Sequence, residues 1–188
     1  MNTNVIIRMA ATADAEEILR IYAPYVKSTA ISFEYDVPSV EEFAERINNT
    51  LKKYPYILAI ENNQIIGYAY ASSFKGRAAY DWAVETTIYI RQDCHGKGIG
   101  KILYLHLEEI LKRQNILNLN ACIAYTSSEN AHLTNASTYF HERLGYKKVA
   151  HFKKCGYKFG NWYDMIWMEK IIGEHCANPK PFIPVSEL

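Results

Sequence analysis

The feature that most constrains this sequence is a strand, a glycine-rich loop and a helix in direct succession. Residues 83–90, "AVETTIYI", carry the β-branched and aromatic side chains typical of a strand. Gly96, Gly98 and Gly100 follow at alternate positions, and residues 99–112 show helical spacing of apolar side chains. Backbone N–H groups at a helix start lack intrahelical partners, and glycine lets an anion come close to them. The segment therefore predicts a phosphate site; a tight turn that merely contains glycines is the alternative.

The usual nucleotide motifs do not fit this loop. A Walker loop needs G-x-x-x-x-G-K-[ST], which does not occur here. The dinucleotide pattern G-x-G-x-x-G requires glycine at the position of Lys101, and the segment lies mid-chain rather than in an N-terminal βαβ unit. A pyrophosphate-bearing ligand of another kind is expected.

Composition narrows the class of protein. The chain has 188 residues, 49% of them hydrophobic, and a net charge of +1, which favours one globular domain and gives no reason to expect nucleic acid or a membrane as a partner. The N-terminus lacks a signal-peptide pattern and no apolar run reaches ~18 residues, so we expect a cytoplasmic protein with free thiols. His151 and Cys155 are four residues apart but have no second ligand pair, so no metal site is expected.

Periodicity along the chain predicts a mixed α/β domain over residues 1–172, in the order βααβββαβαββ. The expected strands are 5–8, 56–62, 64–74, 83–90, 117–125, 147–160 and 161–172, and the expected helices are 12–28, 38–54, 99–112 and 134–146. Residues 173–188 contain three of the six prolines and are expected to run extended over the surface.

Local signals place several helix and strand ends. Thr12 is a candidate N-cap, and Ser39 with Glu42 three residues later has capping-box spacing. The "NNQ" sequence at 62–64 predicts a hairpin turn, and Gly145 is placed to end the last helix.

With these elements in place, "HGKGIG" (95–100) resembles the acyl-CoA loop of the GNAT superfamily of N-acetyltransferases, whose pattern is R/Q-x-x-G-x-G/A. His95 stands where that family usually has Arg or Gln. Further segments resemble the phosphinothricin acetyltransferase-like branch, whose members acetylate the α-amine of glutamate and methionine analogues: "IYAPYV", "ISFEYDVPSVEEF", "GYAYASSFKGRAAYDWAVETTIYI", "FHERLGY" and "KFGNWYDMIWMEK". The resemblance implies the GNAT acyl-CoA N-acyltransferase fold over residues 5–172, with acetyl-CoA as co-substrate and a small-molecule amine as acceptor.

Two residues are the candidate catalytic groups. Glu85 lies in an otherwise apolar strand, where partial desolvation raises a carboxyl pKa toward that of a useful base. In the resembling branch the glutamate of this strand is the proposed base; a salt-bridged or solvent-facing Glu is the alternative. His141 stands where many GNAT enzymes place the tyrosine that protonates the leaving thiolate, and it can act as acid or base. A helix-surface histidine making a hydrogen bond is its alternative.

The resemblance implies three sets of contacts with acetyl-CoA. The backbone of Ile88, Tyr89 and Ile90 would pair with the pantetheine amides. The pyrophosphate would bind the loop formed by His95, Gly96, Lys97, Gly98, Ile99, Gly100 and Lys101. Asn135 or Ser137 would reach the pantetheine arm, with Asn130 as a rival to Asn135.

The acceptor pocket is also implied by the branch. Its expected residues are Phe33, Glu34, Lys75, Arg77, Tyr80 and Trp162, with Trp82 as a further candidate wall. Arg77 could hold an amino acid's carboxylate in a bidentate pair, or be an ordinary solvated charge.

Alternatives to this function remain open. A GNAT enzyme could instead act on a polyamine, an aminoglycoside or a protein N-terminus, although Lys75 and Arg77 would oppose a cationic acceptor. A CoA-binding sensor without turnover would keep the loop and dispense with Glu85 and His141. The branch further implies a homodimer.

Overall fold

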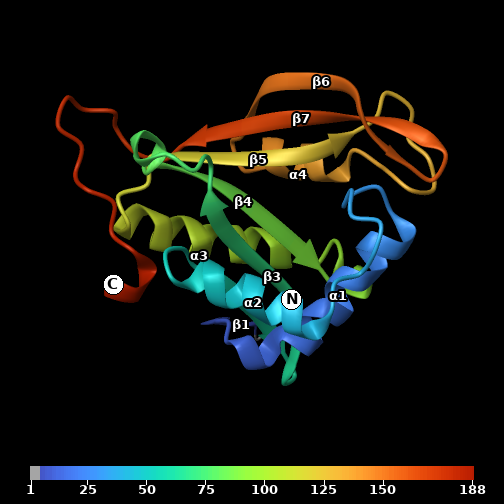
Figure 1. The fold of residues 1–188 in the computed structure, drawn as a ribbon, viewed down its shortest axis with the longest axis horizontal. Coiled ribbons are helices and arrows are strands. Elements are labelled where there is room, and N and C mark those ends of the chain that lie inside the picture. Colours follow the sequence, from blue (N-terminus) through green and yellow to red (C-terminus); the bar gives the residue numbers. More distant parts are fainter. Residues whose placement is uncertain (1–4) are drawn as a thin grey trace. The chain divides into compact units, whose positions relative to one another are not determined.

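The structure, a computed structural model, describes residues 5–188. These residues form the predicted order of strands and helices (Figure 1). The strands are β1 (Ile6–Met9), β2 (Tyr56–Glu61), β3 (Gln64–Ser73), β4 (Ala83–Ile90), β5 (Asn118–Tyr125), β6 (Lys147–Lys158) and β7 (Asn161–Ile171). The helices are α1 (Ala15–Ser28), α2 (Val40–Leu51), α3 (Ile99–Arg113) and α4 (Ala136–Arg143).

The strands form a seven-stranded sheet in the order β1-β2-β3-β4-β5-β7-β6. β1 to β4 pair antiparallel in sequence order, and β6 and β7 form a long antiparallel hairpin. The chain divides into two compact units. The described residues of the first unit are 5–21, 38–119 and 171–188, and the second unit contains 22–37 and 120–170.

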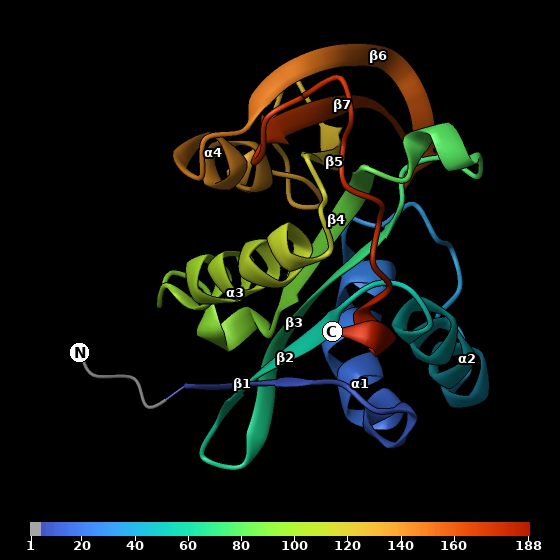
Figure 2. The same ribbon diagram turned by 90° about the vertical axis from the view of Figure 1, so that its left-hand side faces the viewer.

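In the first unit, β2 and β3 lie at the centre of the core. Residues 65–69 of β3 are all buried, which requires cover on both faces of the sheet because neighbouring side chains point to opposite faces. Helices α3 and α2 cover opposite faces of the sheet, α3 over β2 to β4 and α2 over β2 and β3 (Figure 2). Within residues 5–188, no helix is both long and apolar enough to cross a membrane.

The ends of these elements follow local chemistry, with one exception. Ser39 caps α2, since its hydroxyl accepts the Glu42 N–H at 3.1 Å, and the β2–β3 turn uses positive φ at Asn62 and Asn63. Both predictions are confirmed. The predicted N-cap at Thr12 is wrong: residues 12–14 form a 3-10 turn and α1 begins at Ala15. The Asp14 carboxylate stabilises this turn, because it accepts the Ala11 N–H and pairs with Arg8.

Residues 173–188 are tied to the first unit by hydrogen bonds. The Gln114 amide donates to the Lys53 and Ile183 carbonyls at 2.7 and 2.8 Å, and the Ile183 N–H donates to the Gln114 carbonyl at 3.1 Å. Phe182 packs on Tyr54, with ring centroids 5.4 Å apart. The segment predicted to be extended therefore has a fixed path across the ends of α2 and α3.

The second unit is built on the β6–β7 hairpin. Phe159 and Gly160, both with positive φ, form its two-residue turn. Its buried core contains Ala30, Leu133 and Tyr163. The predicted helix end at Gly145 is confirmed, since this residue follows α4 with φ of +91°.

Candidate active site

Glu85 lies on β4 opposite Ser72 of β3, and its side chain is half-buried. Burial raises the pKa of its carboxyl, and the charge of Lys75 opposes that rise. A raised pKa brings the carboxylate nearer to the proton affinity needed for a general base. The environment expected from the apolar sequence of this strand is therefore present.

The strand that carries Glu85 continues toward the glycine loop. β3 occupies one edge of β4, with Ile88, Tyr89 and Ile90 opposite Ala69, Tyr68 and Gly67. The predicted pairing with pantetheine would have to use backbone groups on the other edge of these three residues.

The loop after β4 has the backbone that an anion site needs. Gly96 and Gly98 have φ of +74° and +82°, a conformation that disfavours other residues. Gly98 is the N-cap of α3 and provides no capping side chain, so the first-turn N–H groups are left to other partners. A Cβ added at either glycine would meet open space. The backbone conformation thus favours glycine at positions 96 and 98, and the space beside Gly96 and Gly98 would admit a phosphate.

The His95 ring makes a hydrogen bond within the protein. Its Nε2–H donates to the Ile90 carbonyl at 3.2 Å and so links the loop to the end of β4. The two lysines of the predicted loop, Lys97 and Lys101, are exposed. Ile99 is buried and anchors the start of α3.

His141 is 3% exposed within the second unit. Its Nδ1 lies 2.7 Å from the Ser137 carbonyl one helical turn earlier, which places the proton on Nδ1 in the neutral ring. Burial lowers its pKa to about 4, while the Ser137 carbonyl acts in the opposite direction. At neutral pH the ring is therefore uncharged, which suits a proton acceptor or hydrogen-bonding group better than an imidazolium acid.

The asparagines predicted near the pantetheine arm both hold local backbone. Asn135, the N-cap position of α4, bonds Thr126 with both polar atoms: its Oδ1 accepts the N–H at 3.2 Å and its Nδ2 donates to the carbonyl at 2.9 Å. The Asn130 Oδ1 accepts the His132 and Leu133 N–H groups. Ser137 is half-buried, and its hydroxyl lies 3.4 Å from His141 Nδ1.

The predicted acceptor residues are divided between the two units. In the first unit, Lys75, Arg77 and Tyr80 are exposed on the loop after β3, and Tyr80 contacts Phe74 edge-on. In the second unit, Glu34 accepts a hydrogen bond from the Tyr22 hydroxyl at 3.0 Å.

The other two acceptor candidates are aromatic residues of the second unit. Phe33 packs against the core that contains Tyr163. Trp162 is 61% exposed at the end of the β6–β7 hairpin, where it contacts Tyr157.

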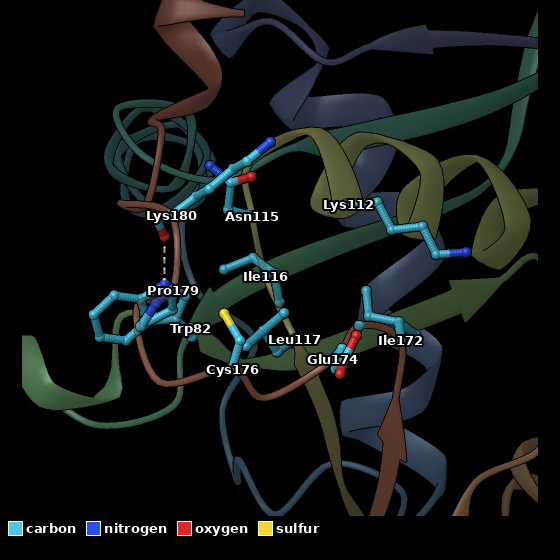
Figure 3. Close-up of a pocket in the computed structure, with 11 residues that line it drawn as sticks. Trp82, Lys112, Asn115, Ile116, Leu117, Ile172, Glu174, Cys176, Pro179 and Lys180 are labelled. Atoms are coloured by element: carbon cyan, nitrogen blue, oxygen red, sulfur yellow. Dashed lines mark hydrogen bonds between the residues drawn. The ribbon is translucent and has the colours of Figure 1, made fainter.

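Trp82, a further candidate wall of the acceptor pocket, contacts the C-terminal segment of the first unit. Its indole N–H donates to the Lys180 carbonyl at 2.7 Å, and it lines a cavity of about 340 Å³ together with Ile116, Cys176 and Pro179 (Figure 3). This cavity lies at the C-terminal end of α3, and the glycine loop lies at the N-terminal end.

One buried cation, Lys158, lies near Glu34 and was not predicted from the sequence. The Lys158 side chain is 3% exposed and donates three hydrogen bonds to the carbonyls of Val26, Thr29 and Ser32, at 2.7 to 2.9 Å. Nothing in "GYKFG" distinguishes it from the exposed lysines of the same strand. Among the residues described, no group of three or more His, Cys, Asp or Glu side chains could hold a metal ion.

With this geometry established, comparison with known proteins decides the family. Residues 7–167 match the acetyltransferase (GNAT) domain. The chain belongs to the GNAT acetyltransferase family. It is 29% identical over 182 residues to phosphinothricin N-acetyltransferase of Streptomyces viridochromogenes, over 97% of this chain and 95% of the relative. It is 32% identical over 165 residues to L-methionine sulfoximine/L-methionine sulfone acetyltransferase of Pseudomonas aeruginosa, over 87% of this chain and 92% of the relative.

Solved structures agree with this assignment. The GNAT chain superposes on a phosphinothricin acetyltransferase from Sinorhizobium meliloti, solved in complex with AcCoA, with a TM-score of 0.84. The two are 34% identical, over 94% of this chain and 92% of that structure. The predicted GNAT fold and the prediction of an acetyl-CoA-dependent N-acetyltransferase are therefore confirmed.

Proposed function

We propose that this GNAT enzyme transfers an acetyl group from acetyl-CoA to the α-amine of a small amino acid or close analogue, of the phosphinothricin, methionine sulfoximine or methionine sulfone type. The observation that carries the proposal is Glu85, a half-buried carboxylate with a raised pKa on the strand that leads into the glycine loop. The named relatives support the choice of acceptor, and an L-amino acid N-acyltransferase of Escherichia coli, 29% identical over 169 residues, agrees with it.

In this proposal the loop and the first turn of α3 hold the pyrophosphate. The open backbone at Gly96 and Gly98 and the absence of a capping side chain at Gly98 fit such a group. Acetyl-CoA supplies an activated thioester when it is bound. Lys97 and Lys101 are exposed cations next to the same N–H groups and add favourable charge.

The acceptor ammonium must lose a proton before its nitrogen can attack. Glu85 takes that proton, directly or through one water, because its raised pKa favours the protonated product of the transfer. In the first unit, Arg77 offers a bidentate partner for a carboxylate, and in the second unit, Glu34 offers a carboxylate for an ammonium. His141, neutral at pH 7, provides an imidazole for hydrogen bonding or for accepting a proton.

A thiol-release assay with acetyl-CoA and a panel of amines tests this function. The panel contains phosphinothricin, methionine sulfoximine, methionine sulfone, a polyamine and an aminoglycoside. We expect CoA release with the amino-acid analogues and little with the polycations. Acetyl-CoA binding without CoA release from any amine would replace the proposal with a non-catalytic sensor.

The proposed assembly is a homodimer, as the resemblance to the phosphinothricin branch implied. Light scattering at micromolar concentration measures it, and a mass close to that of one 21.7 kDa chain would exclude it.

A further inference from the structure

Three consecutive residues of β6 hold the segment that carries Phe33 and Glu34. Lys158 donates to the Ser32 carbonyl at 2.7 Å, and the Tyr35 hydroxyl donates to the Tyr157 carbonyl. The Phe33 ring fills the position beside Gly156 where any other residue would carry Cβ, since three ring atoms would lie within 3 Å of that Cβ. Residues 32–35 are therefore docked on residues 156–158 by three separate contacts.

Lys158 also binds carbonyl groups at the C-terminal end of α1. The last carbonyls of a helix have no intrahelical partner, and a cation there also interacts favourably with the helix dipole. Lys158 donates to the Val26 carbonyl at 2.8 Å and to the Thr29 carbonyl at 2.9 Å. Burial lowers the pKa of Lys158 and the charge of Glu34 raises it. One ammonium thus joins the end of α1 to the Ser32 carbonyl.

A closed set of hydrogen bonds then fixes the Glu34 carboxylate. The Tyr22 hydroxyl donates to Glu34 Oε2 at 3.0 Å and lies 2.7 Å from the Ser32 hydroxyl. The Glu34 N–H donates to the same Ser32 oxygen at 3.3 Å. Tyr22 and Ser32 are both buried and Glu34 is half-buried, so the contact between the two hydroxyls is shielded from water. The position of Ser32, which Lys158 determines, sets the orientation of Glu34.

We propose that Lys158 and Tyr22 are positioning residues for the acceptor amine: they hold segment 32–35 so that Glu34 presents its carboxylate in one orientation to the substrate ammonium. The inference rests on the proposed function. An amino-acid ammonium is recognised by charge-assisted hydrogen bonds, whose strength depends on geometry, so a displaced carboxylate weakens acceptor binding. Acetyl-CoA binding does not use this segment and should be unaffected.

The test compares steady-state kinetics of Lys158→Met and Tyr22→Phe with the wild type, for the best acceptor of the panel. We expect the KM for the amine to rise roughly 10- to 100-fold in Lys158→Met and about tenfold in Tyr22→Phe. The KM for acetyl-CoA should stay within about twofold, because the proposed acetyl-CoA contacts do not include segment 32–35. A loss of folded protein alone would lower the apparent kcat and leave both KM values unchanged. Lys27→Met, which removes an exposed cation from the last turn of α1, is the matched control.

An unchanged amine KM in folded Lys158→Met overturns the proposal. If Lys158→Met does not fold, Tyr22→Phe decides in its place, and an unchanged amine KM there has the same meaning. Amide hydrogen exchange of residues 29–34 separates this result from a failure of the proposed function. If the wild type acetylates no amino acid, faster exchange in the Lys158 variant than in Lys27→Met still supports the docked segment, whereas equal exchange overturns it.

Discussion

At the scale of single residues, Glu85 is subject to two opposing influences. Burial among the side chains around β4 raises the pKa of its carboxyl, and the Lys75 charge lowers it. The first influence is the larger, so the carboxylate is a stronger base than a solvated glutamate. This balance can be changed without touching the carboxylate itself.

Glu85→Gln removes the proton acceptor and keeps the shape of the side chain. We expect kcat/KM to fall roughly 10²- to 10⁴-fold, the range for a general base, with acetyl-CoA affinity near that of the wild type. In the wild type, kcat/KM should decrease on acidification through a pKa above that of a solvated Glu. Lys75→Met should move this acidic limb to higher pH, because it removes the charge that lowers the pKa. Unchanged turnover in Glu85→Gln would remove Glu85 from the mechanism.

His141 makes stability depend on pH. Its pKa is about 4 in the folded protein, against 6.5 for an ordinary histidine, so the unfolded chain binds more protons between these pH values. The stabilisation is fully present above pH 6.5 and is lost as pH falls to about 4. Each pKa unit corresponds to about 1.4 kcal/mol, which gives a loss of roughly 3 kcal/mol over this range.

Urea unfolding of the wild type and His141→Phe at several pH values measures this effect. The free energy of unfolding of the wild type, minus that of His141→Phe, should decrease as pH falls from 6.5 toward 4. A difference that is independent of pH would contradict the neutral, buried imidazole.

At the scale of elements, the start of α3 depends on backbone conformation at Gly98. Its φ of +82° costs other residues about 1–2 kcal/mol, although a Cβ would meet no neighbouring atom. Gly98→Val should therefore lower stability by that amount and weaken acetyl-CoA binding severalfold, because a side chain would enter the space proposed for the pyrophosphate. Gly76→Val is the control, as Gly76 also faces open space and lacks a positive φ. Equal acetyl-CoA affinity in the two variants, measured calorimetrically, would show that the loop does not hold the ligand.

Sequence patterns predicted elements where the deciding chemistry is local. The Ser39 cap, the Asn62–Asn63 turn and Gly145 each act within a few residues. The order of strands and helices along the chain followed from periodicity. Thr12 failed because Asp14, paired with Arg8, stabilises a 3-10 turn that competes with the cap. The partial burial of Glu85 was predictable because its strand is rich in apolar and β-branched residues.

Contacts between distant residues were not predictable from the sequence. Lys158 and Val26 are 132 residues apart, and a lysine among exposed lysines carries no signal of burial. The same limit applies to Trp82, whose partner Lys180 lies 98 residues later in the chain. Each of these contacts joins segments that only the complete fold brings together.

At the scale of the whole molecule, the C-terminal segment contributes to the stability of the first unit. Deleting residues 173–188 removes the Phe182 contact with Tyr54 and one acceptor of the buried Gln114 amide. For a domain of this size each kcal/mol shifts Tm by about 2–4 °C, so we expect a decrease of at least about 5 °C. Deleting only Glu187 and Leu188, both exposed, is the control and should shift Tm by about 1 °C or less. Calorimetry that finds the same Tm for both deletions would show that the tail is an inert extension.

In the proposed function, this GNAT enzyme acetylates the α-amine of an amino acid. A competition assay tests it most directly: labelled acetyl-CoA is supplied with methionine sulfoximine and a polyamine in equal amounts, and the products are separated by mass spectrometry and located by NMR. We expect the label on the α-nitrogen of methionine sulfoximine, and we expect Glu85→Gln to abolish most of it. Label on the polyamine, or on neither amine while acetyl-CoA stays bound, would contradict the proposed function.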